Sequence, residues 1–133
     1  MIPDLSSGAG YHEYRSYSEA DISSYANLSG DHNPIHLDDK IAMEKGFKRR
    51  ICHGMLVVSN ISKILAVNFP GPGTIYLQQS IDFKSPAYPG EKLKYSLTVL
   101  GSDPVKRKYQ IQTDVFHDDG EMVLTGEALV LVR

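Results

Sequence analysis

The chain lacks the features that mark secreted and membrane proteins. It contains one cysteine, Cys52, so no disulfide can form within it. The first ten residues, MIPDLSSGAG, have neither the basic start nor the apolar stretch of an export signal. No uninterrupted apolar run reaches the roughly 20 residues that cross a bilayer, because serine, asparagine and lysine interrupt the longest candidate, Gly54 to Phe69. We therefore expect a soluble, cytoplasmic protein.

The chain also lacks an excess of positive charge. Fourteen lysines and arginines against 16 acidic residues give a formal net charge of -2, which leaves no surplus to neutralise a phosphate backbone, and we expect no nucleic-acid partner. The hydrophobic fraction of 41% and the charged fraction of 23% are typical of globular proteins. A chain of 133 residues most often forms one domain, so we expect residues 1–133 to be a single domain.

The first half of the chain has helical patterns. A short strand is expected at His12 to Tyr17, and Ser18 can cap a following helix that ends near Gly30. Asp38 and Asp39 introduce a second short helix that Gly46 ends. From Gly54 to Phe69 apolar residues cover most of a helix circumference, which predicts a buried central helix that the Pro-Gly-Pro-Gly run at 70–73 ends.

The second half alternates apolar and polar residues, as strands do. We expect strands at Ile75 to Phe83, Leu93 to Val99, Tyr109 to Phe116 and Met122 to Val132. The last is apolar on both faces, so we place it centrally in the sheet. An antiparallel sheet around one hydrophobic helix, an α+β architecture, buries both. Such a small sheet leaves long edges open, and natural proteins usually cover or pair these edges, so a dimer is expected.

A polar loop, Gly30 to His36, separates the first two helices. It places Asp31 and His36 five residues apart, with the stiff Asn33-Pro34 pair between them. A carboxylate and an imidazole held together can bind one water and exchange its protons, which is general acid–base chemistry. The same residues can instead form Asx turns while His36 caps the next helix, and spacing alone does not decide between these interpretations.

The start of the expected central helix, His53-Gly54-Met55, is the second candidate feature. A helix amino terminus exposes unpaired N–H groups, so the N–H of Gly54 can stabilise negative charge on a carbonyl oxygen. The alternative is that Gly54 only allows tight packing between helix and sheet.

The run from Tyr25 to His36, YANLSGDHNPIH, closed by Ala42, resembles the hydratase motif of the MaoC-like family, which includes the (R)-specific enoyl-CoA hydratases. The His53-Gly54-Met55 segment and the later Phe-Lys-Ser-Pro segment at 83–86 are similar to the same family in the same order. The resemblance covers nearly the whole chain. It implies a hot-dog fold and a homodimer.

The resemblance also implies the chemistry. Asp31 and His36 would activate a water for addition to C3 of a 2-enoyl thioester carried by coenzyme A or acyl-carrier protein, while the N–H of Gly54 polarises the thioester carbonyl. Ser62 falls at a position that lies near the site in the family, and Asn33 would support the loop and the water. The reaction needs an acid, a base and an oxyanion donor, and neither a metal nor a redox cofactor.

Four rival interpretations stay open. Possible metal ligands are Asp31, His32, His36 and His53, although Pro34 opposes the helix that would bring His32 and His36 to one face. Cys52 beside His53 could be a nucleophile, but neighbouring side chains usually point apart. A thioesterase and a non-catalytic acyl-thioester-binding protein are the others. The basic residues Lys45, Lys48, Arg49 and Arg50 could meet phosphates of a carrier, and Leu65, Phe69 and Ile81 are candidates for an acyl pocket.

Overall fold

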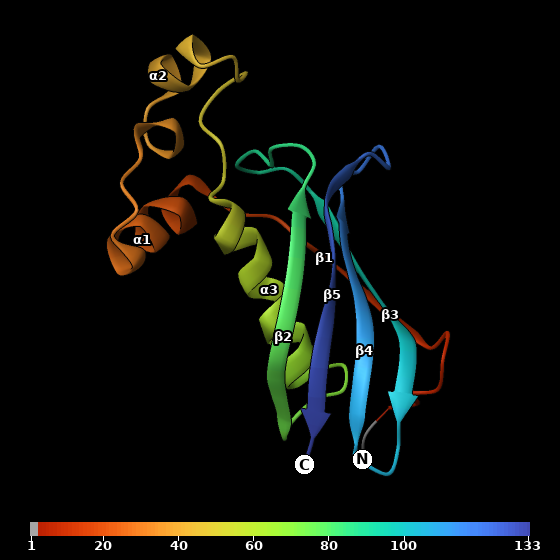
Figure 1. Cartoon of the computed structure of the whole chain (residues 1–133). Coiled ribbons are helices and arrows are strands. Elements are labelled where there is room, and N and C mark those ends of the chain that lie inside the picture. Colours follow the sequence, from red (N-terminus) through yellow and green to blue (C-terminus); the bar gives the residue numbers. More distant parts are fainter. Residues whose placement is uncertain (1–2) are drawn as a thin grey trace.

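The computed structural model describes residues 3–133, and its elements follow the predicted order of strand, helices and four strands (Figure 1). They are β1 (Gly10–Arg15), α1 (Glu19–Ser29), the 3-10 helix η1 (Pro34–His36), α2 (Asp39–Glu44), α3 (Gly54–Val67), β2 (Thr74–Phe83), β3 (Leu93–Asp103), β4 (Lys108–Phe116) and β5 (Met122–Val132). No helix among the described residues is long and apolar enough to span a membrane.

The five strands form one antiparallel sheet in the order β1-β3-β4-β5-β2. Inward-facing residues of β3, β4 and β5 are almost fully buried, which explains the alternation seen in the sequence. The interior place predicted for β5 is confirmed, with neighbours on both sides, but the middle of the sheet is β4. The edges are the short β1 and the longer β2.

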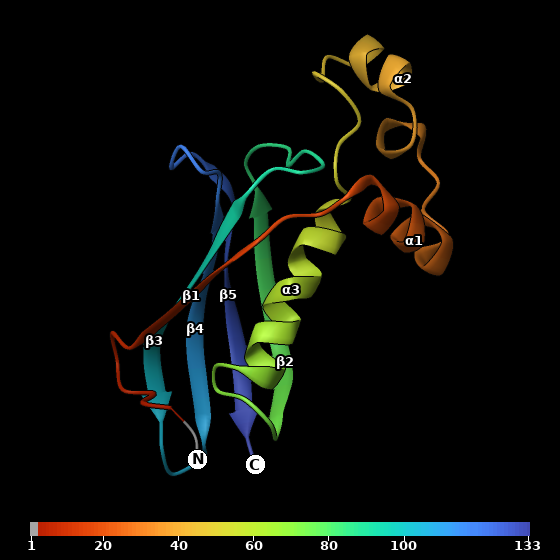
Figure 2. The same cartoon turned by 180° about the vertical axis from the view of Figure 1, so that it is seen from behind.

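Helix α3 packs along one face of this sheet, as the apolar run predicted (Figure 2). Ile61, Ile64 and Leu65 are at most 1% exposed and sit in the core cluster with residues of β3, β4 and β5. The helix is not buried all round, because Met55 and Val67 are 58% and 59% exposed. The sheet covers one side of the helix only, so its outer side stays open to solvent.

The segment of α1, η1 and α2 lies to one side of the sheet, next to the start of α3, and α2 extends past the end of the strands (Figures 1 and 2). Helix α1 begins with a capping box, in which Ser18 and Asp21 each accept the other's backbone N–H, and Gly30 ends it with a φ of 81°. Asp38 caps α2 by accepting the N–H of Ile41. These caps fix both ends of the polar loop beside the amino terminus of α3.

Candidate active site

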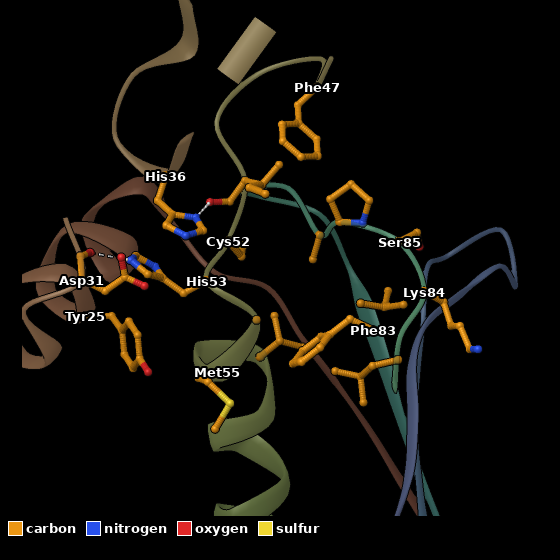
Figure 3. A pocket seen from close by; sticks show the side chains of 17 residues that line it. Tyr25, Asp31, His36, Phe47, Cys52, His53, Met55, Phe83, Lys84 and Ser85 are labelled. Carbon is orange, nitrogen blue, oxygen red and sulfur yellow. Dashed lines mark hydrogen bonds between the residues drawn. The ribbon is translucent and has the colours of Figure 1, made fainter. Parts of the chain in front are cut away.

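A cavity of about 530 Å³ lies between the polar loop, the start of α3 and the connection from β2 to β3. One wall is polar and carries Asp31, His36 and His53, whereas the opposite wall is formed largely by apolar residues such as Phe47 and Phe83 (Figure 3). A largely apolar hollow with a few converging polar groups is typical of a small-molecule site.

Asp31 stands in an Asx turn at the rim of the cavity. Its Oδ1 accepts the N–H of Asn33 at 3.1 Å, and Asn33 Oδ1 in turn accepts the N–H of Ile35 at 3.3 Å. The local-turn interpretation of the loop is therefore correct for these two residues. It does not exclude chemistry, because a carboxylate accepts several hydrogen bonds and the side chain still lines the cavity.

His36 does not cap the next helix, which Asp38 does instead. Its Nδ1 donates to the carbonyl oxygen of Ile51 at 2.8 Å, which fixes the tautomer and leaves Nε2 with a lone pair. The side chain is buried, and burial lowers the pKa of His36 below its usual value of 6.5, with His53 lowering it further. A neutral imidazole with one free nitrogen can accept a proton.

Asp31 and His36 share no direct hydrogen bond within the described residues. One ligand atom from each of Asp31, His36 and His53 lies within 4.8 Å of the other two. Two acceptors at such a separation suit a single bridging water better than a direct contact. This spacing is compatible with one water between carboxylate and imidazole, and the catalytic role of the pair stays a prediction.

Gly54 is the first residue of α3, and no acceptor among residues 3–133 takes its N–H. It borders the cavity with the amino terminus of the helix. A Cβ at this position would lie 2.7 Å from Cε1 of Phe83, so the packing interpretation explains why a glycine stands there. The free N–H is a separate property, and the helix terminus makes it a good donor to a negatively charged oxygen.

The cysteine and metal interpretations fit the geometry poorly. Burial raises the pKa of the Cys52 thiol to about 12, so Cys52 is a protonated core residue and not a nucleophile. The rings of His36 and His53 stack at 3.9 Å between centroids and 25° between planes. Nitrogen lone pairs lie in the ring planes, and nearly parallel planes do not converge on one ion. His32 is apart, with its Nε2 bonded to Asn27.

A family model described as a MaoC-like domain matches residues 8–120. The chain belongs to the MaoC-like family. An (R)-specific enoyl-CoA hydratase of Rhodospirillum rubrum is 39% identical over 129 residues, which cover 97% of this chain and 89% of the relative. A mitochondrial 3-hydroxyacyl-[acyl-carrier-protein] dehydratase of Arabidopsis thaliana is 37% identical over 123 residues, covering 90% and 73%.

The fold of this MaoC-like chain matches solved structures equally well. The (R)-hydratase of Aeromonas caviae involved in PHA biosynthesis superposes with a TM-score of 0.92 at 35% identity, over 97% of this chain and 98% of that one. The hot-dog fold expected from the sequence is thereby confirmed.

Other predicted residues of this MaoC-like protein lie outside the cavity. Asn33 supports the loop but does not line the hollow. Ser62 lies in a neighbouring groove between α3 and β2, which shares only Tyr25 and Met55 with the cavity. Eight residues at about 1.5 Å rise place Ser62 about 12 Å along the helix from Gly54, too far to meet the same atoms. Its part in substrate binding stays a prediction.

The acyl-pocket and phosphate-site candidates also change. Leu65 and Phe69 are core residues and Ile81 lines the groove. The cavity is lined instead by residues that the sequence analysis did not name as acyl-pocket candidates: Phe47, Met55, Phe83 and Leu124. Only the fold brings these four segments together, so no local pattern could have identified them.

Two of the four basic residues considered for a phosphate site have partners within the protein. Arg49 bonds the carbonyl oxygen of Pro89, and Arg50 pairs with Glu19, which leaves the lysines for any phosphate.

Proposed function

We propose that the protein is an (R)-specific enoyl-CoA hydratase, a hydro-lyase that adds water to a trans-2-enoyl-CoA to give (R)-3-hydroxyacyl-CoA. The observation that carries the proposal is the convergence on one cavity of the Asp31 carboxylate, the free Nε2 of His36 and the free N–H of Gly54. The relatives of Rhodospirillum rubrum and Aeromonas caviae, which carry this activity in their names, support it.

The proposed reaction uses these three groups in one sequence. A water held between Asp31 and Nε2 of His36 loses a proton to the pair as its oxygen bonds to C3. The electron pair of the double bond moves toward the thioester oxygen, where the N–H of Gly54 stabilises the negative charge. The pair then returns a proton to C2, so water has been added and the enzyme is unchanged. The pair shares its protons, and we assign acid and base roles to it jointly.

No cofactor is required by this reaction, and the acyl thioester is the only substrate besides water. The alternative carrier is acyl-carrier protein, in which case the protein would dehydrate 3-hydroxyacyl chains in the reverse direction. The name of the Arabidopsis thaliana relative supports that alternative, while two relatives support coenzyme A. Lys84 lines the cavity and is exposed, so it is the side chain that we assign to carrier phosphate.

We also propose that the chain acts as a homodimer of single-domain subunits in the cytoplasm. The core cluster runs from Leu5 to Val132, which supports one domain. Strand β2 is a ten-residue edge whose side chains Ile75 and Leu77 are 37% and 42% exposed, and a second copy pairing there would cover both. Sedimentation of the wild type and of Leu77→Lys tests this. A dimeric wild type that this variant makes monomeric is expected, and a monomeric wild type would refute it.

The central experiment follows crotonyl-CoA hydration by the loss of enoyl absorbance, with chiral analysis of the product and a parallel assay for free thiol. We expect (R)-3-hydroxybutyryl-CoA and no thiol release. Asp31→Asn and His36→Ala should each lower kcat/KM by at least about 100-fold, since each removes half of the water-activating pair.

His32→Ala is the control, because His32 belongs to the same loop but bonds Asn27 and the carbonyl of Gly30 away from the cavity. It should stay within about threefold of wild type if the pair alone does the chemistry. Wild-type rates in both Asp31→Asn and His36→Ala would refute the mechanism, and thiol release without hydration would make the protein a thioesterase.

A further inference from the structure

His53 is a buried histidine that the proposed reaction does not use. It stands immediately before α3 and its side chain is 2% exposed. It makes no side-chain hydrogen bond to cap the helix, although it occupies the cap position. A large polar ring buried at a helix start without capping it needs another explanation.

The ring of His53 is bonded to the polar loop instead. Its Nε2 lies 3.0 Å from the carbonyl oxygen of Asp31, which can only accept, so Nε2 carries the proton (Figure 3). Its Nδ1 is buried and has no hydrogen-bond partner within residues 3–133. A hydrogen on Nδ1 would be a buried donor without a partner, so the bond to Asp31 places the ring hydrogen on Nε2.

The same ring also contacts the second member of the catalytic pair. The His53 ring stacks on the His36 ring at 3.9 Å between centroids. Tyr25 of α1 packs edge-on against the same His53 ring at 4.8 Å between centroids. His36 is therefore held by two contacts, the bond from Nδ1 to Ile51 and the stack.

We propose that His53 is a positioning residue for the hydration reaction: its N–H holds the main chain of Asp31 while its ring supports His36. This inference rests on the proposed function. Since His53 is also the residue before Gly54, one side chain ties the water-activating pair to the oxyanion donor. Misplacement of reacting groups by about 1 Å can cost about 100-fold in rate, so such a tether matters for kcat more than for KM.

Two variants separate the two contacts. His53→Phe keeps an aromatic ring for stacking and removes the N–H, whereas His53→Gln keeps an N–H at the position of Nε2 and removes the ring. We expect His53→Phe to lower kcat about 30- to 100-fold with KM within about threefold, and His53→Gln to retain kcat within about tenfold. The control is His32→Phe, which alters a histidine of the same loop that faces away from the cavity.

The pH profile supplies a readout that a purely structural role would not move. Both variants remove the His53 ring charge that lowers the pKa of His36. Phenylalanine keeps His36 buried, so the acid side of the kcat/KM profile should move upward only a little. Glutamine also lets water reach His36, so it should move the acid side further toward the usual histidine value. The other titratable groups that line the cavity are unchanged in both variants: Tyr25, Asp31, Cys52 and Lys84. Rates are expressed per folded molecule, measured by thermal unfolding of each preparation.

The outcomes are distinct from those of the proposed function. A wild type without hydratase activity refutes the function itself. An active wild type with a His53→Phe variant of unchanged kcat refutes the positioning role. Equal losses in the phenylalanine and glutamine variants, with the same acid limb in both, would mean that His53 only fills space.

Discussion

Two carboxylate–histidine pairs lie at the same end of the molecule, and only one of them has the free ring nitrogen that the proposed reaction needs. Asp31 and His36 do not bond each other. His36 Nδ1 donates to the carbonyl oxygen of Ile51, while its Nε2 has no hydrogen-bond partner in the described part of the chain. Glu91 and His117 bond each other directly through Nδ1, and the Nε2 of His117 is 2.7 Å from Oγ of Ser85. The second ring has no nitrogen left for a substrate.

The second pair, together with Ser85, has the carboxylate–histidine–serine order of groups found in serine hydrolases, but its neighbouring N–H groups are already bonded. Ser85 Oγ donates to the carbonyl oxygen of Met122 at 2.8 Å, and the backbone N–H groups of Lys84 and Ser85 both donate to Val123. These two N–H groups, which are next to the hydroxyl in the chain, are thus not available to stabilise a tetrahedral oxyanion. The cluster fastens the β2–β3 connection to the β4–β5 hairpin, and unused hydrogen-bonding capacity is what distinguishes Asp31 and His36.

Replacing one histidine of each pair by alanine should give the largest contrast. His36→Ala removes the proton acceptor and should lower kcat/KM for crotonyl-CoA by at least about 100-fold, while His117→Ala should stay within about fivefold per folded molecule. Steady-state rates corrected for the folded fraction measure both. A loss of 100-fold in His117→Ala would mean that the second pair also takes part in the reaction.

For the free energy of unfolding we expect the reverse order, with a larger loss in His117→Ala than in His36→Ala. His117→Ala leaves the half-buried Glu91 and Ser85 without their shared partner, so we expect the free energy of unfolding to fall by about 1–2 kcal/mol in urea titrations. Glu91→Gln is the matched variant, because it keeps the side-chain length and removes the charge. If neither change lowers the urea midpoint, the Glu91–His117–Ser85 cluster does not stabilise the contact between the β2–β3 connection and the β4–β5 hairpin.

The pH dependence should also single out His36. Burial holds its pKa below 6.5, so its nitrogen stays free and activity should persist at pH values somewhat below 6.5. A folded-state pKa that is depressed means that the unfolded chain takes up the proton first, so folding stability contributed by neutral His36 declines as pH falls below 6.5. Loss of activity already above pH 6.5, in kcat/KM profiles, would contradict a buried neutral base.

Cys52→Ser should have the smallest effect. The thiol is buried and protonated, so the change should leave kcat/KM within about threefold, measured in the same assay. A loss of more than about 100-fold would restore the nucleophile interpretation.

Much of the architecture could be predicted from periodicity, because each strand and helix has its own apolar pattern. The strand order could not be predicted in this way, since the pairing of β1 with β3 joins residues 78 to 88 positions apart in the chain, such as Tyr11 and Leu97. Of the proposed site, the loop motif indicated Asp31 and His36. The tether from His53 to Asp31 and the Phe83 ring over Gly54 arise only after folding, and no local spacing encodes them.

The segment from Ile51 to Gly54 has a consequence for how such a site can change. The carbonyl of its first residue accepts a bond from His36, the ring of its third bonds the main chain of Asp31, and its fourth has the N–H that we propose as oxyanion donor. An insertion or deletion of one residue there would change the distance between the proposed acid–base groups and this N–H. New acyl specificities should therefore be sought by changing the apolar wall at Phe47, Met55 and Phe83, while the segment from Ile51 to Gly54 keeps its length of four residues.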